Sequence, residues 1–348
     1  MSYTYEAVAR PKSGLRLHLN ENTGGCSPAV LHAIRAVTRQ DVAFYPSYDE
    51  AVAACAARFE LTPDHFVLTN GLDEGILVTT IAALRDRGAE RPEAIVVVPA
   101  FDMYASTSDA VGATIVPVAL GRDFEVPVEA VIGAVTPRTR LLFLTSPNNP
   151  TGLLIPRADI LRMAAAAPQV LVFLDEAYAD FAGVSLVDDP EAAALPNLLV
   201  GRTFAKAYGI AGLRAGIVTG HPDTIARLAR VVPPFSINAC AVAAICAGLA
   251  DREYYDWYLA QVRESKALLY DALRTWQLPF WESAANFVLV RAGDRAKAIV
   301  DGLAARGIHV RDRSNDPSSP GCIRITTGVV EHTSACVRAL EEVLCGAE

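Results

Sequence analysis

The stretch LLVGRTFAKAYGIAGLRAG, residues 198–216, joins an apolar run to a glycine-rich segment that contains one lysine. Residues 198–200 predict a short buried strand, and Lys206 follows it inside the glycine-rich part. Burial removes water from a lysine in such a place, which lowers the pKa of its amine and makes it a nucleophile. The stretch therefore predicts a reactive lysine just beyond a buried strand.

Lysine is scarce in this chain, where four of the 31 basic residues are lysine. Lys266 and Lys297 lie in amphipathic helical patterns, and Lys12 follows a proline near the N-terminus. We expect these three to be exposed, solubilising charges. Lys206 is the lysine whose surroundings indicate chemistry.

Short apolar runs on both sides of this stretch predict further buried strands, and helical patterns at 73–87 and 155–167 lie between them. The predicted strands are 66–68, 94–98, 141–144, 170–174, 198–200 and 216–219. Strands that are apolar on both faces and alternate with helices indicate an α/β fold, with a mostly parallel sheet between two layers of helices.

From about residue 234 the pattern changes to α+β. One long helical region at 238–276 is followed by segments that predict antiparallel strands and by a final helix. A chain of 348 residues is long for one core. We expect a large domain at 29–240 and a smaller domain formed by 1–28 with 241–348.

The composition is typical of a soluble globular protein, with 52% hydrophobic and 20% charged residues. A net charge of −8 argues against a nucleic-acid or anionic-membrane surface. No apolar run is long enough for a membrane span or a signal peptide. Seven scattered cysteines without a C-x-x-C pair predict neither a metal site nor a disulfide framework, so we expect a cytoplasmic protein.

Three motifs precede the lysine in the chain. TNGLDEGI (69–76) places Gly71, Leu72 and Asp73 at a strand-to-helix turn, where backbone N–H groups bind a phosphate well. SPNNPTG (146–152) follows a predicted strand, and its simplest interpretation is a turn. LDEAYADF (174–181) puts Asp175 at the end of a strand, where α/β sheets hold ligands, although a helix cap is the alternative.

In this order and spacing, the motifs resemble those of the fold-type I aminotransferases, and most closely those of histidinol-phosphate aminotransferases. The resemblance covers essentially the whole chain, from LNEN (19–22) to the last helix. It implies pyridoxal 5′-phosphate as the cofactor, held by Lys206 as a Schiff base (the aldimine). It also implies that the domain at 29–240 binds the cofactor.

The resemblance assigns a contact to each part of the cofactor. Asp175 would pair with the pyridine nitrogen, because the ring draws electrons only while that nitrogen is cationic. Asn149 and Tyr178 would bond the phenolic oxygen, and Phe101 would stack on the ring. The residues implied near the phosphate are Gly71, Leu72, Asp73, Thr203 and Arg214. Tyr45 would reach across a homodimer interface to the partner's cofactor phosphate, so that two chains share each site.

For the substrate, the resemblance implies Arg324 as the carboxylate-binding arginine, Arg311 near a distal phosphate, and Asn20 in a segment that closes over the substrate. Arginine suits both anions, because its planar fork donates two parallel hydrogen bonds. The chain departs from the family pattern at Ala205, where a serine is usual, and this removes a hydroxyl from the phosphate site. Tyr3 and Tyr5 are candidates for an N-terminal substrate contact.

The implied reaction interconverts imidazole-acetol phosphate and L-glutamate with histidinol phosphate and 2-oxoglutarate. Two alternatives share the cofactor motifs. One is an aminotransferase for aromatic or other amino acids. The other is a lyase similar to threonine-phosphate decarboxylase. The motifs shared by all three do not separate them.

Overall fold

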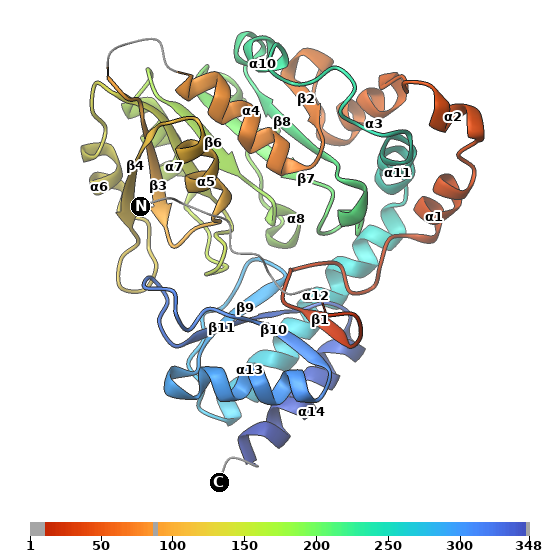
Figure 1. Ribbon diagram of the computed structural model, residues 1–348, viewed down its shortest axis with the longest axis vertical. Helices are drawn as coiled ribbons and strands as arrows, with labels where there is room; N and C mark the ends of the chain where they lie inside the picture. The colour runs from red at the N-terminus through yellow and green to blue at the C-terminus, as the bar shows by residue number, and fades with distance from the viewer. Residues whose placement is uncertain (1–10, 86–89, 346–348) are drawn as a thin grey trace.

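The computed structural model describes residues 11–85 and 90–345, which form two β-sheets with helices packed against each (Figure 1). The strands are β1 (Leu15–Leu17), β2 (Phe66–Thr69), β3 (Glu93–Val98), β4 (Thr114–Ala119), β5 (Thr139–Thr145), β6 (Leu171–Asp175), β7 (Leu198–Thr203), β8 (Gly216–Gly220), β9 (Phe287–Arg291), β10 (Ile308–Asp312) and β11 (Cys322–Thr326). Tyr3 and Tyr5 lie outside the described residues.

Helices connect these strands. The α-helices are α1 (Pro28–Arg35), α2 (Arg39–Ala43), α3 (Asp49–Phe59), α4 (Leu72–Leu84), α5 (Met103–Ala110), α6 (Val128–Gly133), α7 (Arg157–Ala166), α8 (Ala179–Ala182), α9 (Pro190–Ala193), α10 (Pro222–Ala229), α11 (Ala239–Ala250), α12 (Arg252–Thr275), α13 (Ala296–Ala305) and α14 (Val330–Cys345). Short 3-10 helices are η1 (Pro63–His65), η2 (Ala211–Leu213) and η3 (Gly293–Arg295).

The larger sheet has the strand order β2-β8-β7-β6-β5-β3-β4. The strands from β7 to β4 run parallel, and β8 runs antiparallel to both of its neighbours. The predicted α/β fold with a mostly parallel sheet is therefore confirmed. The sequence did not predict β4, because this edge strand contains Pro117 and is half exposed, so it lacks a continuous apolar run.

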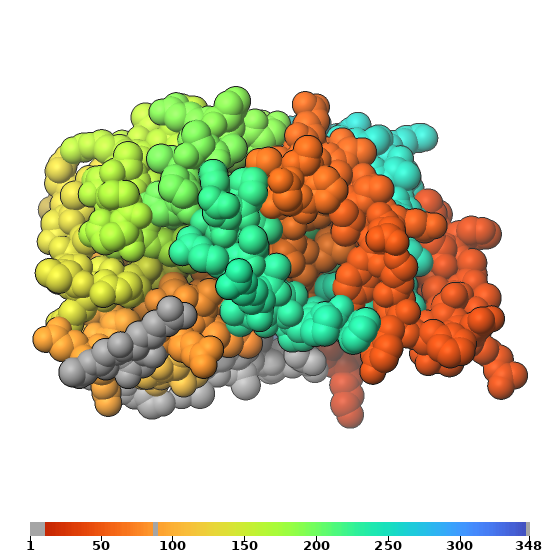
Figure 2. Space-filling view, turned by 90° about the horizontal axis from the view of Figure 1, so that it is seen from above, coloured from red at the N-terminus to blue at the C-terminus, as the bar shows by residue number. Residues whose placement is uncertain are grey.

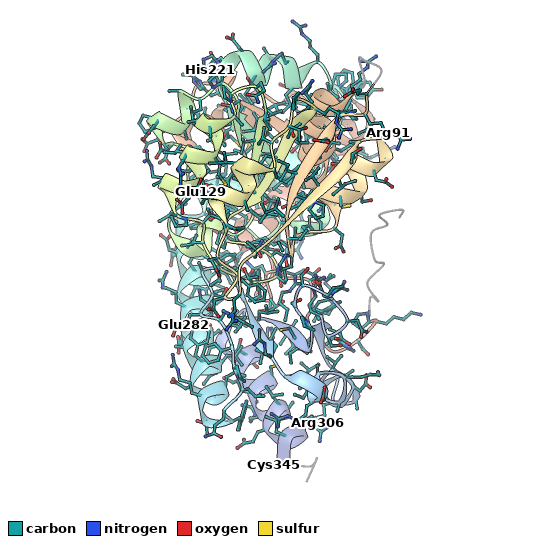
Figure 3. The ribbon with its side chains drawn as sticks, turned by 90° about the vertical axis from the view of Figure 1, so that its left-hand side faces the viewer. Arg91, Glu129, His221, Glu282, Arg306 and Cys345 are labelled. Carbon is teal, nitrogen blue, oxygen red and sulfur yellow. The ribbon has the colours of Figure 1, made fainter. Side chains whose placement is uncertain are left out.

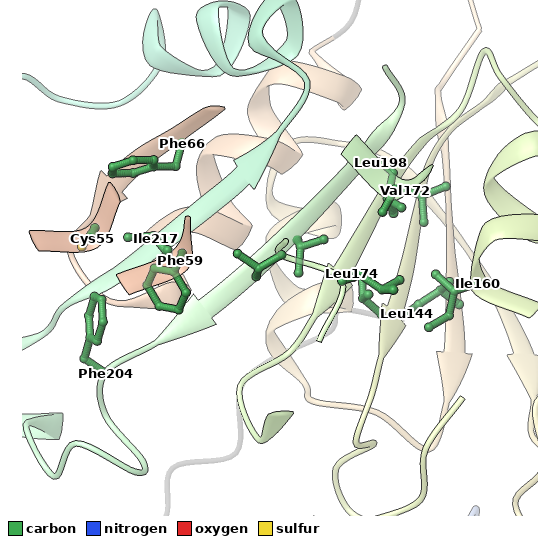
Figure 4. Close-up of a cluster of buried hydrophobic side chains, with 14 of the residues drawn as sticks. Cys55, Phe59, Phe66, Leu144, Ile160, Val172, Leu174, Leu198, Phe204 and Ile217 are labelled. Carbon is green, nitrogen blue, oxygen red and sulfur yellow. The ribbon is translucent and has the colours of Figure 1, made fainter. Parts of the chain in front are cut away.

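Helices cover both faces of the larger sheet, because successive strand residues point to opposite sides. Ile95 and Leu142 face a core with α1, α3, α7 and α11, part of which is drawn in Figure 4. Val96 and Leu141 face the opposite core with α4, α5 and α10. Figure 2 shows the end of this domain that lies farthest from the smaller sheet, where α10 packs beside η1 and β2.

The smaller sheet has the order β1-β10-β11-β9, with α12, α13 and α14 packed against it. The strands β10, β11 and β9 pair antiparallel, as the sequence predicted for this region. β1 comes from the N-terminal part of the chain and pairs parallel with β10. This pairing brings the segment that follows β1 to the boundary between the two sheets.

The predicted helical region at 238–276 consists of two helices. The side chain of Asp251 accepts a hydrogen bond from the N–H of Tyr254 at 3.1 Å and so begins α12. Its backbone, at φ −84° and ψ 74°, leaves the helical region and ends α11. A single aspartate therefore ends α11 and caps the start of α12.

α12 contributes side chains to both cores. Tyr255 belongs to the core of the larger sheet, and Leu269 belongs to the core of the smaller one. α11 packs against α1 and α3 and adds Ile245 to the first core. We therefore propose that the two domains divide inside α12, later than the predicted boundary at residue 240.

The structure separates the three lysines that we expected to be exposed, and Lys12 is exposed as predicted. Lys297 is exposed as predicted and pairs with Asp301 at 2.8 Å. The prediction for Lys266 is wrong, because Lys266 is only 9% exposed. It lies one turn after Val262 and three residues before Leu269, both of which belong to the buried face of α12. The helical spacing, followed strictly, places Lys266 on that face.

Across the described residues, no helix combines the length and the hydropathy that crossing a membrane requires. Nor do His, Cys, Asp or Glu side chains in this part of the chain gather in a group that could hold a metal ion. All seven cysteines are free thiols.

Candidate active site

The candidate site is a cavity of about 220 Å³ at the carboxyl ends of the parallel strands, beside the smaller sheet. Open α/β sheets bind their ligands at this edge. β6 ends at Asp175 and β7 ends at Thr203, and both residues line the cavity. The predicted residues that line it are Asn20, Leu72, Asp73, Phe101, Asn149, Asp175, Tyr178, Thr203, Lys206, Arg214, Arg311 and Arg324.

Lys206 lies in a tight loop after β7. Its Nζ donates a hydrogen bond to the carbonyl oxygen of Leu19 at 3.0 Å, and it lies 5.8 Å from the centre of the Tyr178 ring. Gly209 closes the loop with φ +71°, and a Cβ there would lie 2.2 Å from the carbonyl oxygen of Gly25. The glycine in the lysine motif therefore allows the loop to pack against the N-terminal segment, with the amine in the cavity.

Asp175 is buried at the end of β6. Its Oδ2 accepts a hydrogen bond from the Tyr104 hydroxyl at 2.6 Å, and its Oδ1 accepts one from the N–H of Ala177 at 2.8 Å. Burial raises the pKa of the Asp175 carboxyl to about 6, although both hydrogen bonds oppose this shift. A carboxylate in such a place gains much from a cationic partner.

Tyr104 is a site residue that the sequence analysis missed. It is fully buried on α5, stacks on Phe143 at 4.7 Å, and contacts Thr145 as well as Asp175. The motif search stopped at Phe101, which meets the Tyr104 ring edge-on. Because α5 begins at the carboxyl end of β3, its first turn necessarily faces the site. That placement was the signal available in the sequence.

The N-terminus of α4 forms one end of the cavity. Gly71 precedes it with φ +73°, and a Cβ on Gly71 would lie 2.4 Å from Nη2 of Arg214. Arg214 therefore lies directly over this helix terminus, where it pairs with Asp73 at 2.7 Å. A Cβ on Gly216 would lie 2.9 Å from the N atom of Leu72, so β8 also approaches closely. A helix N-terminus beside a guanidinium attracts an anion.

Asn149, which follows β5 of the larger sheet, contacts Arg324 in β11 of the smaller sheet. Nη1 of Arg324 donates to Oδ1 of Asn149, and its Nη2 donates to the carbonyl oxygen of His18 at 2.8 Å. Because an arginine can only donate, this contact fixes the orientation of the Asn149 amide. The amide nitrogen of Asn149 is left to donate to another acceptor.

Asn20 and Tyr178 form a second contact, between the N-terminal segment and the loop that follows β6. Nδ2 of Asn20 donates to the Tyr178 hydroxyl at 3.0 Å, so the hydroxyl proton can point to a further acceptor. Asn20 is only 1% exposed and also bonds Thr326 of β11 through its backbone and its side chain. The structure thus brings the LNEN segment to the edge of the cavity.

Basic side chains gather where the smaller sheet meets the cavity. Arg311 of β10 and Arg324 of β11 are directly opposed in the antiparallel register, so they lie on the same face. Arg313, two residues after Arg311, also lines the cavity and pairs with Asp316. The sequence analysis missed Arg313, although two-residue spacing in a strand indicates a shared face. Three guanidinium groups at one end favour an anionic ligand.

Tyr45 lies away from the cavity of its own chain. It is 75% exposed and stacks on Phe235 with ring centres 4.0 Å apart. Val42 and Phe44 beside it are exposed as well. The role predicted for Tyr45 in a partner's site stays a prediction.

The donor set of the cavity fits pyridoxal 5′-phosphate. Lys206 supplies an amine for the aldehyde, and Asp175 supplies a buried carboxylate for a cationic ring nitrogen. The N-terminus of α4 with Arg214 supplies a site for the phosphate. The amide nitrogen of Asn149 is available for the phenolic oxygen.

The fold and this site define an α/β enzyme with an amine and a buried carboxylate in one cavity. The model of the family described as aminotransferase class I and II matches residues 12–341, so the chain belongs to that family. It is an aminotransferase, and the cofactor is pyridoxal 5′-phosphate.

Within the family, similar curated proteins are histidinol-phosphate aminotransferases. The protein of that name from Roseiflexus castenholzii is 37% identical over 344 residues, which cover 94% of this chain and 89% of that protein. Histidinol-phosphate aminotransferase 2 of Nitrosospira multiformis is 34% identical over 336 residues, 94% of this chain and 83% of that protein. The solved histidinol-phosphate aminotransferase from Sinorhizobium meliloti, in complex with pyridoxal-5′-phosphate, has a TM-score of 0.87 at 27% identity and covers 97% of this chain and 92% of its own.

Proposed function

We propose that this aminotransferase interconverts imidazole-acetol phosphate and L-glutamate with histidinol phosphate and 2-oxoglutarate. The observation that carries the proposal is the arginine group formed by Arg311, Arg313 and Arg324 at the end of the cavity nearest the smaller sheet. Guanidinium groups bind phosphate and carboxylate by parallel hydrogen bonds, and both anions occur among these substrates. The curated relatives are named histidinol-phosphate aminotransferases, which supports histidinol phosphate as one of the substrates.

The bound cofactor would supply an electron-accepting ring on which the amino group is carried. Asp175 would hold the ring nitrogen in its cationic form, because a buried carboxylate stabilises an adjacent cation. Asn149 and Tyr178 would donate to the phenolic oxygen, and Phe101 would lie against the ring. The phosphate would be held by Arg214, Thr203, Gly71, Leu72 and Asp73.

Lys206 is the lysine that lines the cavity in the described part of the chain. We assign to it the covalent attachment of the cofactor and the movement of the substrate's α-proton. Ala205 also lines the cavity, and its N–H donates to Oγ1 of Thr203 at 3.1 Å. Without a hydroxyl at position 205, the phosphate would have one hydrogen-bond donor fewer than in the usual family pattern.

We further propose a homodimer that shares its active sites. Val42, Phe44, Tyr45 and Phe235 expose apolar side chains beside a groove along α1, α2 and α11. Such a patch favours burial against another protein surface. A second copy would cover it and bring Tyr45 to its cofactor phosphate. If Tyr45→Ala leaves a dimer with unchanged affinity for the cofactor, the shared-site part of the proposal is wrong.

A cytoplasmic location is part of the same proposal. The free cysteines agree with a reducing compartment. Fractionation of cells that produce the full chain would test it, and recovery outside the cytoplasm would contradict it.

The substrate is tested by mixing the cofactor-loaded enzyme with one amino donor at a time. Conversion of the bound cofactor to its amino form is followed by absorbance within a single turnover. We expect histidinol phosphate and glutamate to convert the cofactor, and phenylalanine to do so poorly. Rapid conversion by aromatic amino acids alone would favour the alternative aminotransferase. Release of carbon dioxide from threonine phosphate would indicate the lyase.

A further inference from the structure

Lys266 is a buried amine that the assigned chemistry does not use. Its Nζ donates to the carbonyl oxygen of Ser283 at 2.6 Å, and the charge that acts on it among the described residues is that of Arg263, not that of a carboxylate. Burial lowers the pKa of the Lys266 amine to about 8, and the nearby charge of Arg263 adds to the effect. A buried amine without an acid partner is costly to stability. An apolar side chain of the same length would fill this place more favourably, so a further role for Lys266 is expected.

Lys266 and Tyr270, one turn apart on α12, both bond the backbone of Ser283. The Tyr270 hydroxyl, one turn further along α12, accepts a hydrogen bond from the N–H of Ser283 at 2.7 Å. Figure 3 shows Glu282, the residue before Ser283, beside α12. The segment that connects α12 to β9 is thus fixed to the helix at one residue, through both of its backbone polar groups.

This segment in turn touches the turn that carries Asn149. The N–H of Ala284 donates to the carbonyl oxygen of Gly152 at 2.8 Å. A Cβ on Gly152 would lie 2.2 Å from Oγ and 3.2 Å from Cα of Ser283, so the backbone of Gly152 packs directly against Ser283. The N–H of Gly152 donates to the carbonyl oxygen of Asn148 at 2.7 Å, which closes the turn around Asn149.

We propose that Lys266 is a positioning residue for the aminotransferase reaction, acting through Ser283 and Ala284 on the turn that aims Asn149 into the cavity. The inference rests on the proposed contact of Asn149 with the phenolic oxygen of the cofactor. Arg324 fixes the Asn149 amide from the cavity side, and Lys266 holds Ser283, which packs against the far end of the same turn. The smaller domain therefore sets this cofactor contact from two directions.

The first experiment compares Lys266→Met with Lys297→Met, a matched change of an exposed lysine, in the cofactor-loaded enzyme. Asn149 would stabilise the deprotonated phenolic oxygen, so a loosened turn should raise the pH midpoint of the cofactor's absorbance change. We expect Lys266→Met to raise it by about 0.5–1 pH unit and to lower kcat by about 3–10-fold. KM for glutamate should stay within about twofold, because ground-state binding is not altered.

Lys266→Arg keeps a cation on α12 and should recover part of the shift, whereas Lys297→Met should match the wild type in every measurement. Tyr270→Phe loses the acceptor for the Ser283 N–H and should shift the midpoint in the same direction by less. It serves in place of Lys266→Met if that variant does not fold. A wild-type midpoint in Lys266→Met, or in Tyr270→Phe where that variant replaces it, would overturn the proposal.

Asn149→Ala separates this inference from the function on which it rests. If Asn149→Ala leaves the absorbance titration unchanged, the proposed role of Asn149 is wrong. If Asn149→Ala shifts the titration and Lys266→Met does not, only the inference about Lys266 fails, and the proposed role of Asn149 stands. In the double variant that combines Asn149→Ala with Lys266→Met, we expect the same pH midpoint as in Asn149→Ala by itself. A further shift in the double variant would mean that Lys266 acts by another route, and would overturn the proposal.

Discussion

At the cofactor end of the cavity, two hydrogen bonds join residues only two apart in the chain, whereas at the substrate end two hydrogen bonds join residues 306 apart. Asp175 accepts from Ala177, and Thr203 accepts from Ala205. By contrast, Arg324 donates to the carbonyl oxygen of His18. One end is formed by short motifs on neighbouring strands, and the other exists only after the N-terminal segment pairs with the smaller sheet.

This difference has a functional consequence. Residues at the cofactor end would act in both half-reactions, because every substrate meets the same ring and phosphate. Residues at the substrate end would distinguish one amino donor from another. Variants at the two ends should therefore differ in which substrates they affect, and this contrast can be measured.

The largest expected effect is that of Lys206→Ala. Because the lysine would both hold the cofactor and move the α-proton, kcat should fall by at least about 10³-fold with every donor. Steady-state rates with histidinol phosphate and with glutamate measure this, and Lys297→Ala is the control. Borohydride reduction should link the cofactor to the wild type and to Lys297→Ala, but not to Lys206→Ala. A loss confined to one donor would break the comparison between the two ends.

The next effect concerns the pH dependence of stability in the cofactor-free protein. The pKa of Asp175 is raised to about 6 in the folded state, so the folded state holds this proton more tightly than the unfolded state does. Stability from this proton is present at low pH and is lost as the pH rises from about 4 to about 6, by up to about 3 kcal/mol. Denaturant unfolding of the wild type and of Asp175→Asn at each pH gives the difference between their unfolding free energies. Parallel curves for the two proteins would contradict the raised pKa.

At the substrate end, Arg311→Gln should impair the phosphorylated donor selectively. Loss of a charge-assisted contact should lower kcat/KM for histidinol phosphate by about 10–100-fold, with a change for glutamate of less than about threefold. Cofactor affinity should not change. Arg306→Gln, an exposed arginine of the same domain that pairs with Glu342, is the control. Equal losses for both donors would place Arg311 in a shared function instead.

The smallest expected effect is a gain of cofactor affinity in Ala205→Ser. The new hydroxyl would face the cavity and restore the usual donor near the phosphate, so the dissociation constant of the cofactor should fall about 2–5-fold. Equilibrium dialysis of the cofactor measures it. Weaker binding would show that the loop after β7 has no room for the hydroxyl.

Most residues predicted for the cofactor end line one cavity, because they lie in compact motifs at the ends of strands with long apolar runs; their contacts with the cofactor stay predictions. The sequence also predicted the central strands, for the same reason. Tyr104 and Arg313 were missed, since each stands a few residues beyond a motif, on an element that reaches the site only in the folded chain. The burial of Lys266 was missed although its spacing from Val262 and Leu269 places it on the buried face of α12. Contacts between distant segments, such as that of Asn20 with Thr326, have no local signal in the sequence.

The placement of α12 in both cores has a consequence for how the protein denatures. A helix of 24 residues is about 36 Å long, which is enough to span the two domains. Neither core can lose its packing without removing a support from the same helix. The two domains should therefore share one cooperative unit, and the protein should melt in a single calorimetric transition despite its two sheets.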